Sequence, residues 1–133
     1  PIRPPVPGVD LPQVYTLREL RDADRLHAAA TGAKRAVVIG GGFIGLEMAE
    51  NLVHRGITTT VVELADQILP PWDAEMVSPV PDHLRERGDT LKLSNAAAAI
   101  EPASRATSSG EMVPAAPGTT MMAFSPLLSL TKI

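Results

Sequence analysis

The chain has 133 residues and a formal net charge of −3, which suits one domain with a real core but is short for a complete enzyme with two cofactors. This balance argues against nucleic acid or a membrane surface as a partner, and no apolar run approaches the roughly 20 residues of a membrane span. The absence of cysteine excludes disulfides, thiolate metal sites and a thiol nucleophile. The three histidines lack the spacing of metal ligands, so we expect no metal site. Because the sequence shows neither a membrane-length apolar run nor a basic-then-apolar leader, we expect a cytoplasmic location.

The first 12 residues, PIRPPVPGVDLP, contain five prolines and therefore few backbone donors. We expect an extended crossover or linker segment there. Thr16 followed by Glu19 fits a capping box, and apolar residues at helical spacing then predict a helix to about Ala30, with Gly32 as its end. The apolar face of this leading helix would be partly exposed if nothing covered it.

The stretch from residue 35 to residue 63, RAVVIGGGFIGLEMAENLVHRGITTTVVE, has the pattern of a βαβ dinucleotide-binding unit. An apolar run from Ala36 to Ile39 leads into a glycine-rich turn. Apolar residues spaced three and four apart then predict a helix that Gly56 can close. A second β-branched run, Ile57 to Val62, ends in the carboxylate of Glu63. Glycines also serve ordinary turns, but here every part of the unit occurs in order.

Each part of this unit has a physical reason. Gly40 allows the tight turn, Gly42 lacks the Cβ that would keep a pyrophosphate from the backbone, and Gly45 lets the helix lie close on the sheet. The N–H groups at the start of the helix then face the pyrophosphate charge. Glu63 can accept both hydroxyl hydrogens of the adenosine ribose and would repel a 2′-phosphate. No Lys or Arg lies between Glu63 and Trp72, so the sequence predicts NAD(H) over NADP(H).

The next segment is placed for a helix, with Asp73 as its cap and Gly88 as its end. Pro79 and Pro81 lie inside it, and an interior proline costs about 3 kcal/mol and removes a backbone hydrogen bond. We therefore expect a short turn near residues 74–78 and a helix that restarts near residue 82.

A third parallel strand is predicted from Thr90 to Leu93. The following NAAAAI, residues 95–100, makes a poor strand because of its four alanines. Residues 101–133 lack periodicity and are rich in small and polar residues, which predicts an irregular or disordered tail. Within it, Met121 to Leu130 is apolar but contains Pro126, which favours a marginal strand or a sticky tail over a functional motif.

Three blocks occur in order: VPGVDLPQVYTLRELRDADRL, AVVIGGGFIGLEMAENL and VVELADQILPPWDAEM. Together they resemble the NAD-binding domain of the FAD-dependent pyridine nucleotide-disulfide oxidoreductases, most of all the coenzyme A-disulfide reductase, NADH oxidase and NADH peroxidase branch. The resemblance covers about residues 1–93. It implies an enzyme in which NADH reduces a flavin and the flavin then reduces a cysteine-based centre or dioxygen.

The resemblance also assigns residues. Phe43 stands where the family has an aromatic residue that gates the nicotinamide pocket, with packing on the sheet as the alternative. Glu47 matches a carboxylate that pairs with a lysine near the flavin, a lysine not found in this chain; the alternative is an acid favoured by the helix dipole. The candidate cofactor-binding residues are Gly40, Gly41, Gly42, Phe43, Ile44, Gly45, Glu47 and Glu63.

The family's FAD-binding glycine motif, redox cysteine region, Gly-Asp flavin motif and dimerisation domain do not occur in these residues. We therefore expect a central fragment with an α/β fold: a Rossmann-like βαβ unit with a mainly parallel sheet, incomplete at its C-terminal end. Residues 1–33 would form the proline-rich crossover arm and leading helix, residues 34–100 the NAD-binding Rossmann domain, and residues 101–133 the tail.

Three functional hypotheses remain open. The first is an NAD(H)-binding domain that positions NADH for hydride transfer to FAD, with the flavin site outside this chain, no catalytic residue within it and no turnover by the chain alone. The parent enzyme would be a possible homodimer. The second is a non-catalytic nucleotide-binding module that works with a partner, and the third a degenerate fragment that does not fold stably. The final electron acceptor is left open.

Overall fold

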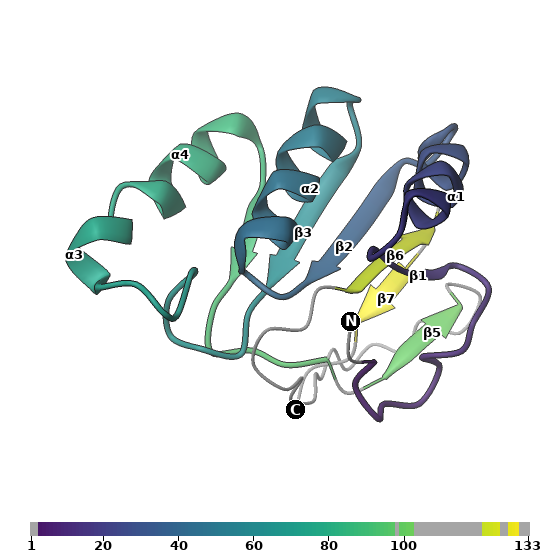
Figure 1. Ribbon diagram of the computed structural model, residues 1–133, viewed down its shortest axis with the longest axis horizontal. Coiled ribbons are helices and arrows are strands. Elements are labelled where there is room, and N and C mark those ends of the chain that lie inside the picture. Colours follow the sequence, from purple (N-terminus) through teal and green to yellow (C-terminus); the bar gives the residue numbers. More distant parts are fainter. Residues whose placement is uncertain (1–2, 98, 103–120, 126–127, 131–133) are drawn as a thin grey trace.

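The computed structural model describes residues 3–97, 99–102, 121–125 and 128–130 (Figure 1). The elements within these residues are β1 (Val14–Thr16), α1 (Leu20–Ala30), β2 (Arg35–Ile39), α2 (Phe43–His54), β3 (Thr58–Val62), α3 (Ala74–Val77), α4 (Val80–Arg87), β4 (Thr90–Lys92), β5 (Ile100–Pro102), β6 (Met121–Ser125) and β7 (Leu128–Leu130). In this described part, five strands form one sheet in the order β1-β6-β2-β3-β4, and β5 pairs with β7.

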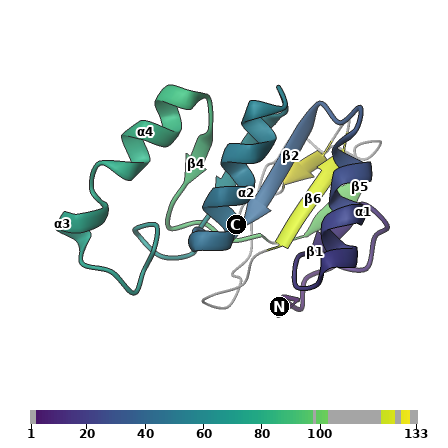
Figure 2. The same cartoon turned by 45° about the horizontal axis from the view of Figure 1, so that its top comes forward.

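The centre of the sheet has the predicted βαβ arrangement. Strands β2, β3 and β4 are parallel, with Val38 opposite Val61 and Val61 opposite Leu91. Helix α2 connects β2 to β3, and α3 and α4 connect β3 to β4. Figures 1 and 2 show α1, α2 and α4 along one face of the sheet. The α/β, Rossmann-like fold predicted from the sequence is therefore confirmed.

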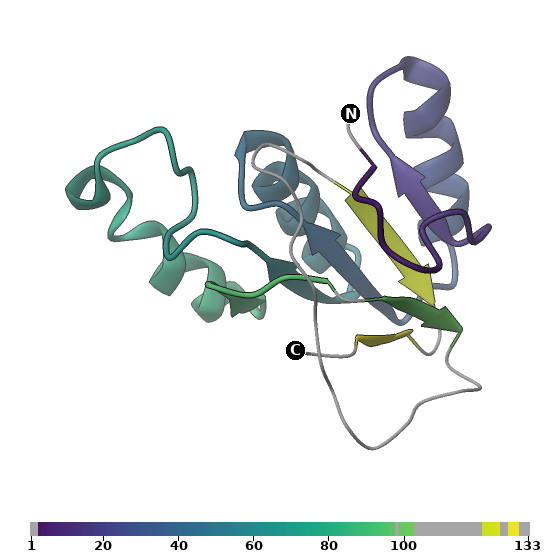
Figure 3. The same ribbon diagram turned by 90° about the horizontal axis from the view of Figure 1, so that it is seen from below.

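Strand β2 is central because its side chains are buried on both faces of the sheet. Ala36 and Val38 pack in a core with residues of α1, α2 and β3. Val37 and Ile39 point to the other face, into a second core that includes residues of the N-terminal arm and of residues 97–100. Figure 3 shows the arm and β5 on the side of the sheet away from α2. The uninterrupted apolar run of β2 thus reflects a strand covered on both faces.

The N-terminal arm is packed as a series of turns, so the expected extended linker is wrong in form. Gly8 has φ +83°, and a Cβ there would lie 1.8 Å from the carbonyl oxygen of Ile100. The backbone N–H of Ile100 donates to the carbonyl oxygen of Pro7 over 2.8 Å. Proline lacks a donor but keeps its acceptor, which is how this arm is joined to the end of the domain.

Helix α1 begins later than predicted, because Thr16 belongs to β1 and Glu19 is the N-cap. The capping partner of Glu19 is Asp22, whose Oδ2 accepts from the backbone N–H groups of Arg18 and Glu19, each over 2.9 Å. The predicted Thr16–Glu19 capping box is therefore wrong, although the end of the helix at Ala30 is confirmed.

The prolines split the segment after β3 as predicted. Helix α3 has Asp73 at its N-cap, and α4 ends at Arg87 before Gly88, which has φ +103°. Helix α4 starts at Val80 rather than near residue 82, because Pro81 lies in the first turn, where a backbone N–H has no intrahelical partner to lose.

An irregular tail was expected beyond residue 100, but the described residues there form strands. Strand β6 lies between β1 and β2 and is antiparallel to both. Strand β7 pairs antiparallel with β5. Residues 103–120, 126–127 and 131–133 lie outside the described residues, so the expectation for them stays as it was. A short apolar run followed by a proline gives a weak strand signal, and the pairing with β1 and β2 is too distant in sequence for a local pattern to reveal.

Candidate functional site

The turn after β2 is held to the end of β3. Gly40 has φ +108°, a left-handed conformation that favours glycine. Its N–H donates to the carbonyl oxygen of Val62 over 2.8 Å. The glycine turn therefore lies at the carboxyl ends of two neighbouring parallel strands, where ligands of open α/β sheets bind.

The other glycines differ in the space around them. A Cβ at Gly45 would lie 2.0 Å from the carbonyl oxygen of Gly40, so α2 can approach the turn only because residue 45 has no side chain. At Gly42, the N-cap of α2, a Cβ would meet no atom of the described residues within 4 Å. At the N-terminus of α2, the described residues therefore leave free space beside the backbone of Gly42. This geometry shows the tight turn at Gly40 and the close approach of α2 at Gly45, whereas pyrophosphate binding at Gly42 stays a prediction.

Glu63 is buried, with 7% of its surface exposed. Its Oε2 accepts from the N–H of Gly41 over 2.6 Å, and its Oε1 accepts from the N–H of Ala65 over 2.9 Å. The carboxylate therefore fastens the glycine turn to the end of β3. Each oxygen keeps a further lone pair, so these bonds leave acceptor capacity for ribose hydroxyls. The sequence predicted only a ligand-binding role for Glu63 and not this fastening role. The one signal for it was Gly41, the second glycine of the turn.

The loop after β3 folds back onto the glycine turn. Leu69, with φ +49°, donates its N–H to the carbonyl oxygen of Gly41 over 2.9 Å. Ile68 is fully buried, and a Cβ at Gly41 would touch its Cγ2 at 3.2 Å. The side chain of Gln67 donates to the carbonyl oxygen of Trp72 over 2.7 Å. The loop thus forms one wall of the candidate site, which sequence reasoning missed.

Two aromatic rings stand together at the start of α2. Phe43 is 61% exposed and Trp72 is 45% exposed, and their ring centroids lie 5.8 Å apart at 75°, an edge-to-face arrangement. Ile44 is 52% exposed. The alternative interpretation of Phe43 as a residue packed on the sheet is wrong, because its ring is exposed beside the glycine turn.

Glu47 lies farther along α2 and is exposed. With Phe43 it lines a hollow of about 390 Å³ between α2 and α4. Across this hollow, Arg87 donates to Glu50 over 2.6 Å and contacts Nε2 of His54 at 3.0 Å. Among the described residues, no group of three or more His, Cys, Asp or Glu could hold a metal ion.

The described part of the chain also holds one buried carboxyl group without a partner there. Asp89 is 5% exposed, and neither of its oxygens has a hydrogen-bond partner. Burial raises the pKa of Asp89, and the charge of Glu50 raises it further. Asp89 follows α4 and is not among the residues of the glycine turn, so it concerns stability rather than the candidate site.

The fold and the glycine turn together define a Rossmann-like α/β domain. The family model described as pyridine nucleotide-disulphide oxidoreductase matches residues 1–118. The chain belongs to this family of oxidoreductases. Along the described residues, no helix is long and apolar enough to cross a membrane.

Individual relatives agree with this assignment. The chain is 34% identical over 124 residues to the NADH-dependent phenylglyoxylate dehydrogenase subunit epsilon of Aromatoleum evansii, covering 92% of this chain and 28% of the relative. The structure of reduced Bacillus anthracis CoADR-RHD is 42% identical with a TM-score of 0.71, covering 74% of this chain and 18% of that one. The water-forming NADH oxidase from Lactobacillus brevis bound to NADH is 25% identical with a TM-score of 0.75, covering 100% and 27%. The chain thus spans less than a third of these proteins.

Proposed function

We propose that this chain binds NAD(H) and positions NADH for hydride transfer to a flavin held by another part of a FAD-dependent oxidoreductase. The observation that carries the proposal is the open backbone of Gly42 at the N-terminus of α2, beside the tight turn at Gly40. A pyrophosphate at this position would face N–H groups and the positive end of the helix dipole. The fit of these residues to a dinucleotide thus rests on geometry as well as on the sequence motif.

Glu63 would select NAD(H). Because both of its oxygens are already held by backbone N–H groups, the carboxylate is fixed before any ligand arrives. Its remaining lone pairs would accept the ribose hydroxyls, whereas a 2′-phosphate would meet a buried like charge. The specificity proposed from the sequence therefore gains a positional argument.

When bound, NADH supplies the hydride and the flavin accepts it. The residues of this chain would bind and orient the dinucleotide. Phe43 and Trp72 would offer an apolar, exposed edge for the nicotinamide ring beside α2. Glu47 would reach toward a lysine of the flavin-binding part, a role that rests on the resemblance alone. No acid or base of this chain is required for the transfer itself.

Catalytic turnover by the parent enzyme, a homodimeric state of that enzyme and a cytoplasmic location belong to the same proposal, whereas the chain alone should show no turnover. The second candidate function, a nucleotide-binding module that works only with a partner, is favoured by the exposed apolar side chains of Phe43, Trp72 and Met76. The two candidates share the nucleotide site and differ in whether hydride reaches a flavin. Flavin reduction by NADH after addition of a flavin-binding partner would distinguish them.

The test is a titration of the purified chain with NADH and, in parallel, NADPH, followed by nicotinamide fluorescence. We expect saturable NADH binding and at least about tenfold weaker NADPH binding, a difference of about 1.4 kcal/mol. Gly42→Ala is the sharpest variant, because its methyl group would meet no protein atom of the described residues within 4 Å but would occupy the pyrophosphate position. We expect unchanged stability and weakened NADH binding.

A folded chain that binds neither nucleotide would overturn the proposal. Equal affinity for NADH and NADPH would refute the role of Glu63 while leaving the nucleotide site itself supported. Circular dichroism of each variant separates a loss of binding from a loss of fold.

A further inference from the structure

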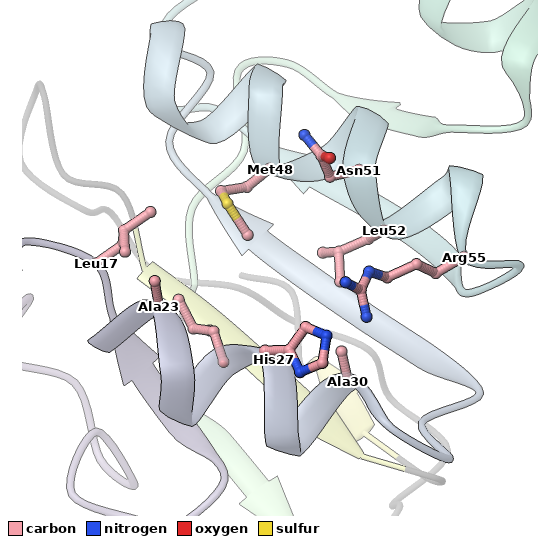
Figure 4. A pocket seen from close by; sticks show the side chains of 9 residues that line it. Leu17, Ala23, His27, Ala30, Met48, Asn51, Leu52 and Arg55 are labelled. Carbon is pink, nitrogen blue, oxygen red and sulfur yellow. The ribbon is translucent and has the colours of Figure 1, made fainter. Parts of the chain in front are cut away.

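A second concave surface lies between α1 and α2, away from the glycine turn. It is a groove of about 260 Å³ (Figure 4). Its floor is apolar: Leu26 of α1 is 3% exposed and Leu52 of α2 is 2% exposed. Ala23 and Met48 extend this apolar surface along the two helices. The groove uses the second half of α2, whereas the glycine turn precedes the first half.

One end of the groove is basic. His27 and Arg55 both line it, and within the described residues neither side chain has a hydrogen bond or an ion pair. Figure 4 shows the guanidinium of Arg55 turned back from the end of α2 over the groove, on the side of His27. None of the lining residues is acidic. Basic side chains are common at the C-terminal end of a helix. Because the Arg55 side chain lies over an apolar groove, it would also contact a ligand bound in that groove.

We propose that this groove binds a small amphipathic carboxylate, with the carboxylate between Arg55 and His27 and an alkyl or aryl tail over Leu26 and Leu52. Small-molecule sites are mostly apolar with a few polar groups that fix orientation, as here. The volume lies below the range for drug-sized ligands, which limits the tail to a short one. A guanidinium can bind a carboxylate through two parallel hydrogen bonds. This proposal is independent of the NAD(H) site.

The probe is sodium octanoate, titrated into the full chain by isothermal titration calorimetry and by amide chemical shifts. Saturable binding is expected, with shifts confined to residues of the groove. Octanol, with the same tail and no charge, should bind at least about tenfold more weakly, the size of one charge-assisted hydrogen bond. Absence of saturation by octanoate, or equal binding of octanol, would overturn the proposal.

Two variants test the basic end. Arg55→Met removes the charge but keeps much of the aliphatic chain, and it should weaken octanoate binding about tenfold. Asn51→Glu places a carboxylate in the last turn of α2, four residues before its C-cap Arg55, where the two side chains can pair. This intramolecular pair should compete with octanoate. Arg85→Met, on α4 and outside the groove, is the matched control and should bind as the unmodified chain does.

Arg55 and Asn51 are both exposed, so these variants should remain folded. Unchanged octanoate affinity in both would refute the proposed position of the carboxylate. Self-association of the chain that protects the groove from octanoate, seen by light scattering, would mean that a second copy is the occupant and would equally refute the proposal.

Discussion

Replacing Glu63 should cost stability before it affects any ligand. The carboxylate accepts two backbone N–H groups, from Gly41 at 2.6 Å and from Ala65 at 2.9 Å, and is 7% exposed. A hydrogen bond to a charged group contributes about 1.5–3 kcal/mol. Glu63→Ala removes both bonds, so the free energy of unfolding should fall by about 3–6 kcal/mol. Since a domain of this kind is stable by about 5–15 kcal/mol, the variant would lose a large share of its stability.

Glu63→Gln is the more informative change, because it keeps the size and shape of the side chain. An amide has one acceptor oxygen, so one of the two N–H groups would face an NH₂ donor instead of an acceptor. We expect a loss of about 2–3 kcal/mol. Glu47→Gln, the same substitution at an exposed position of α2, is the control and should stay within about 0.5 kcal/mol.

The assay is urea unfolding, followed by circular dichroism and by the fluorescence of Trp72, the only tryptophan. Trp72 lies in the loop that folds onto the glycine turn, so its signal also reports local loosening. A Glu63→Gln variant as stable as the Glu47→Gln control would refute the fastening role. The affinity effect of Glu63→Ala on NADH, about 1–3 kcal/mol, can be measured only while the variant remains folded.

Three further changes probe the frame around the site. Gly45→Ala should destabilise by about 2–3 kcal/mol, because its Cβ would lie 2.0 Å from a backbone oxygen; equal stability by urea unfolding would contradict the close approach of α2. Gly88→Ala, at φ +103°, should cost about 1 kcal/mol, and a rise in melting temperature would count against the left-handed end of α4. The pKa of Asp89 is raised in the folded chain, so its contribution to stability is full below the unfolded value of about 3.9 and is lost as pH rises through the folded value. Asp89→Asn should therefore be more stable than the unmodified chain at pH 7, by about 1 kcal/mol, with the difference shrinking toward pH 4; a difference independent of pH would refute this assignment.

The sequence was most informative where the chemistry is local. The glycines and the apolar runs beside them predicted β2, α2 and β3 because turn geometry and side-chain periodicity act over a few residues. Pro79 and Pro81 predicted the break between α3 and α4 for the same reason. In each case the residue itself limits the backbone, so no distant contact was needed.

What the sequence did not predict depends on distant contacts. The N-cap of α1 is Glu19 rather than the predicted Thr16, because Thr16 belongs to β1 and pairs with β6. The hydrogen bond between Glu63 and Gly41 joins two segments that only the folded sheet brings together. The packing of Trp72 against Phe43 likewise depends on the path of the loop after β3. Such features can be found by building the fold, but not by scanning for patterns.

The position of β6 has a consequence for biosynthesis. Strand β1 reaches the rest of the sheet only through β6 in the described structure, with Val14 paired to Ala123. A ribosome releases the chain from its N-terminus, so β1 emerges long before its neighbour exists. Before β6 is synthesised, β2, β3 and β4 can already pair, whereas β1 has no partner strand and its edge is unpaired. Nascent chains halted before residue 121 should thus be the species most prone to associate through that edge.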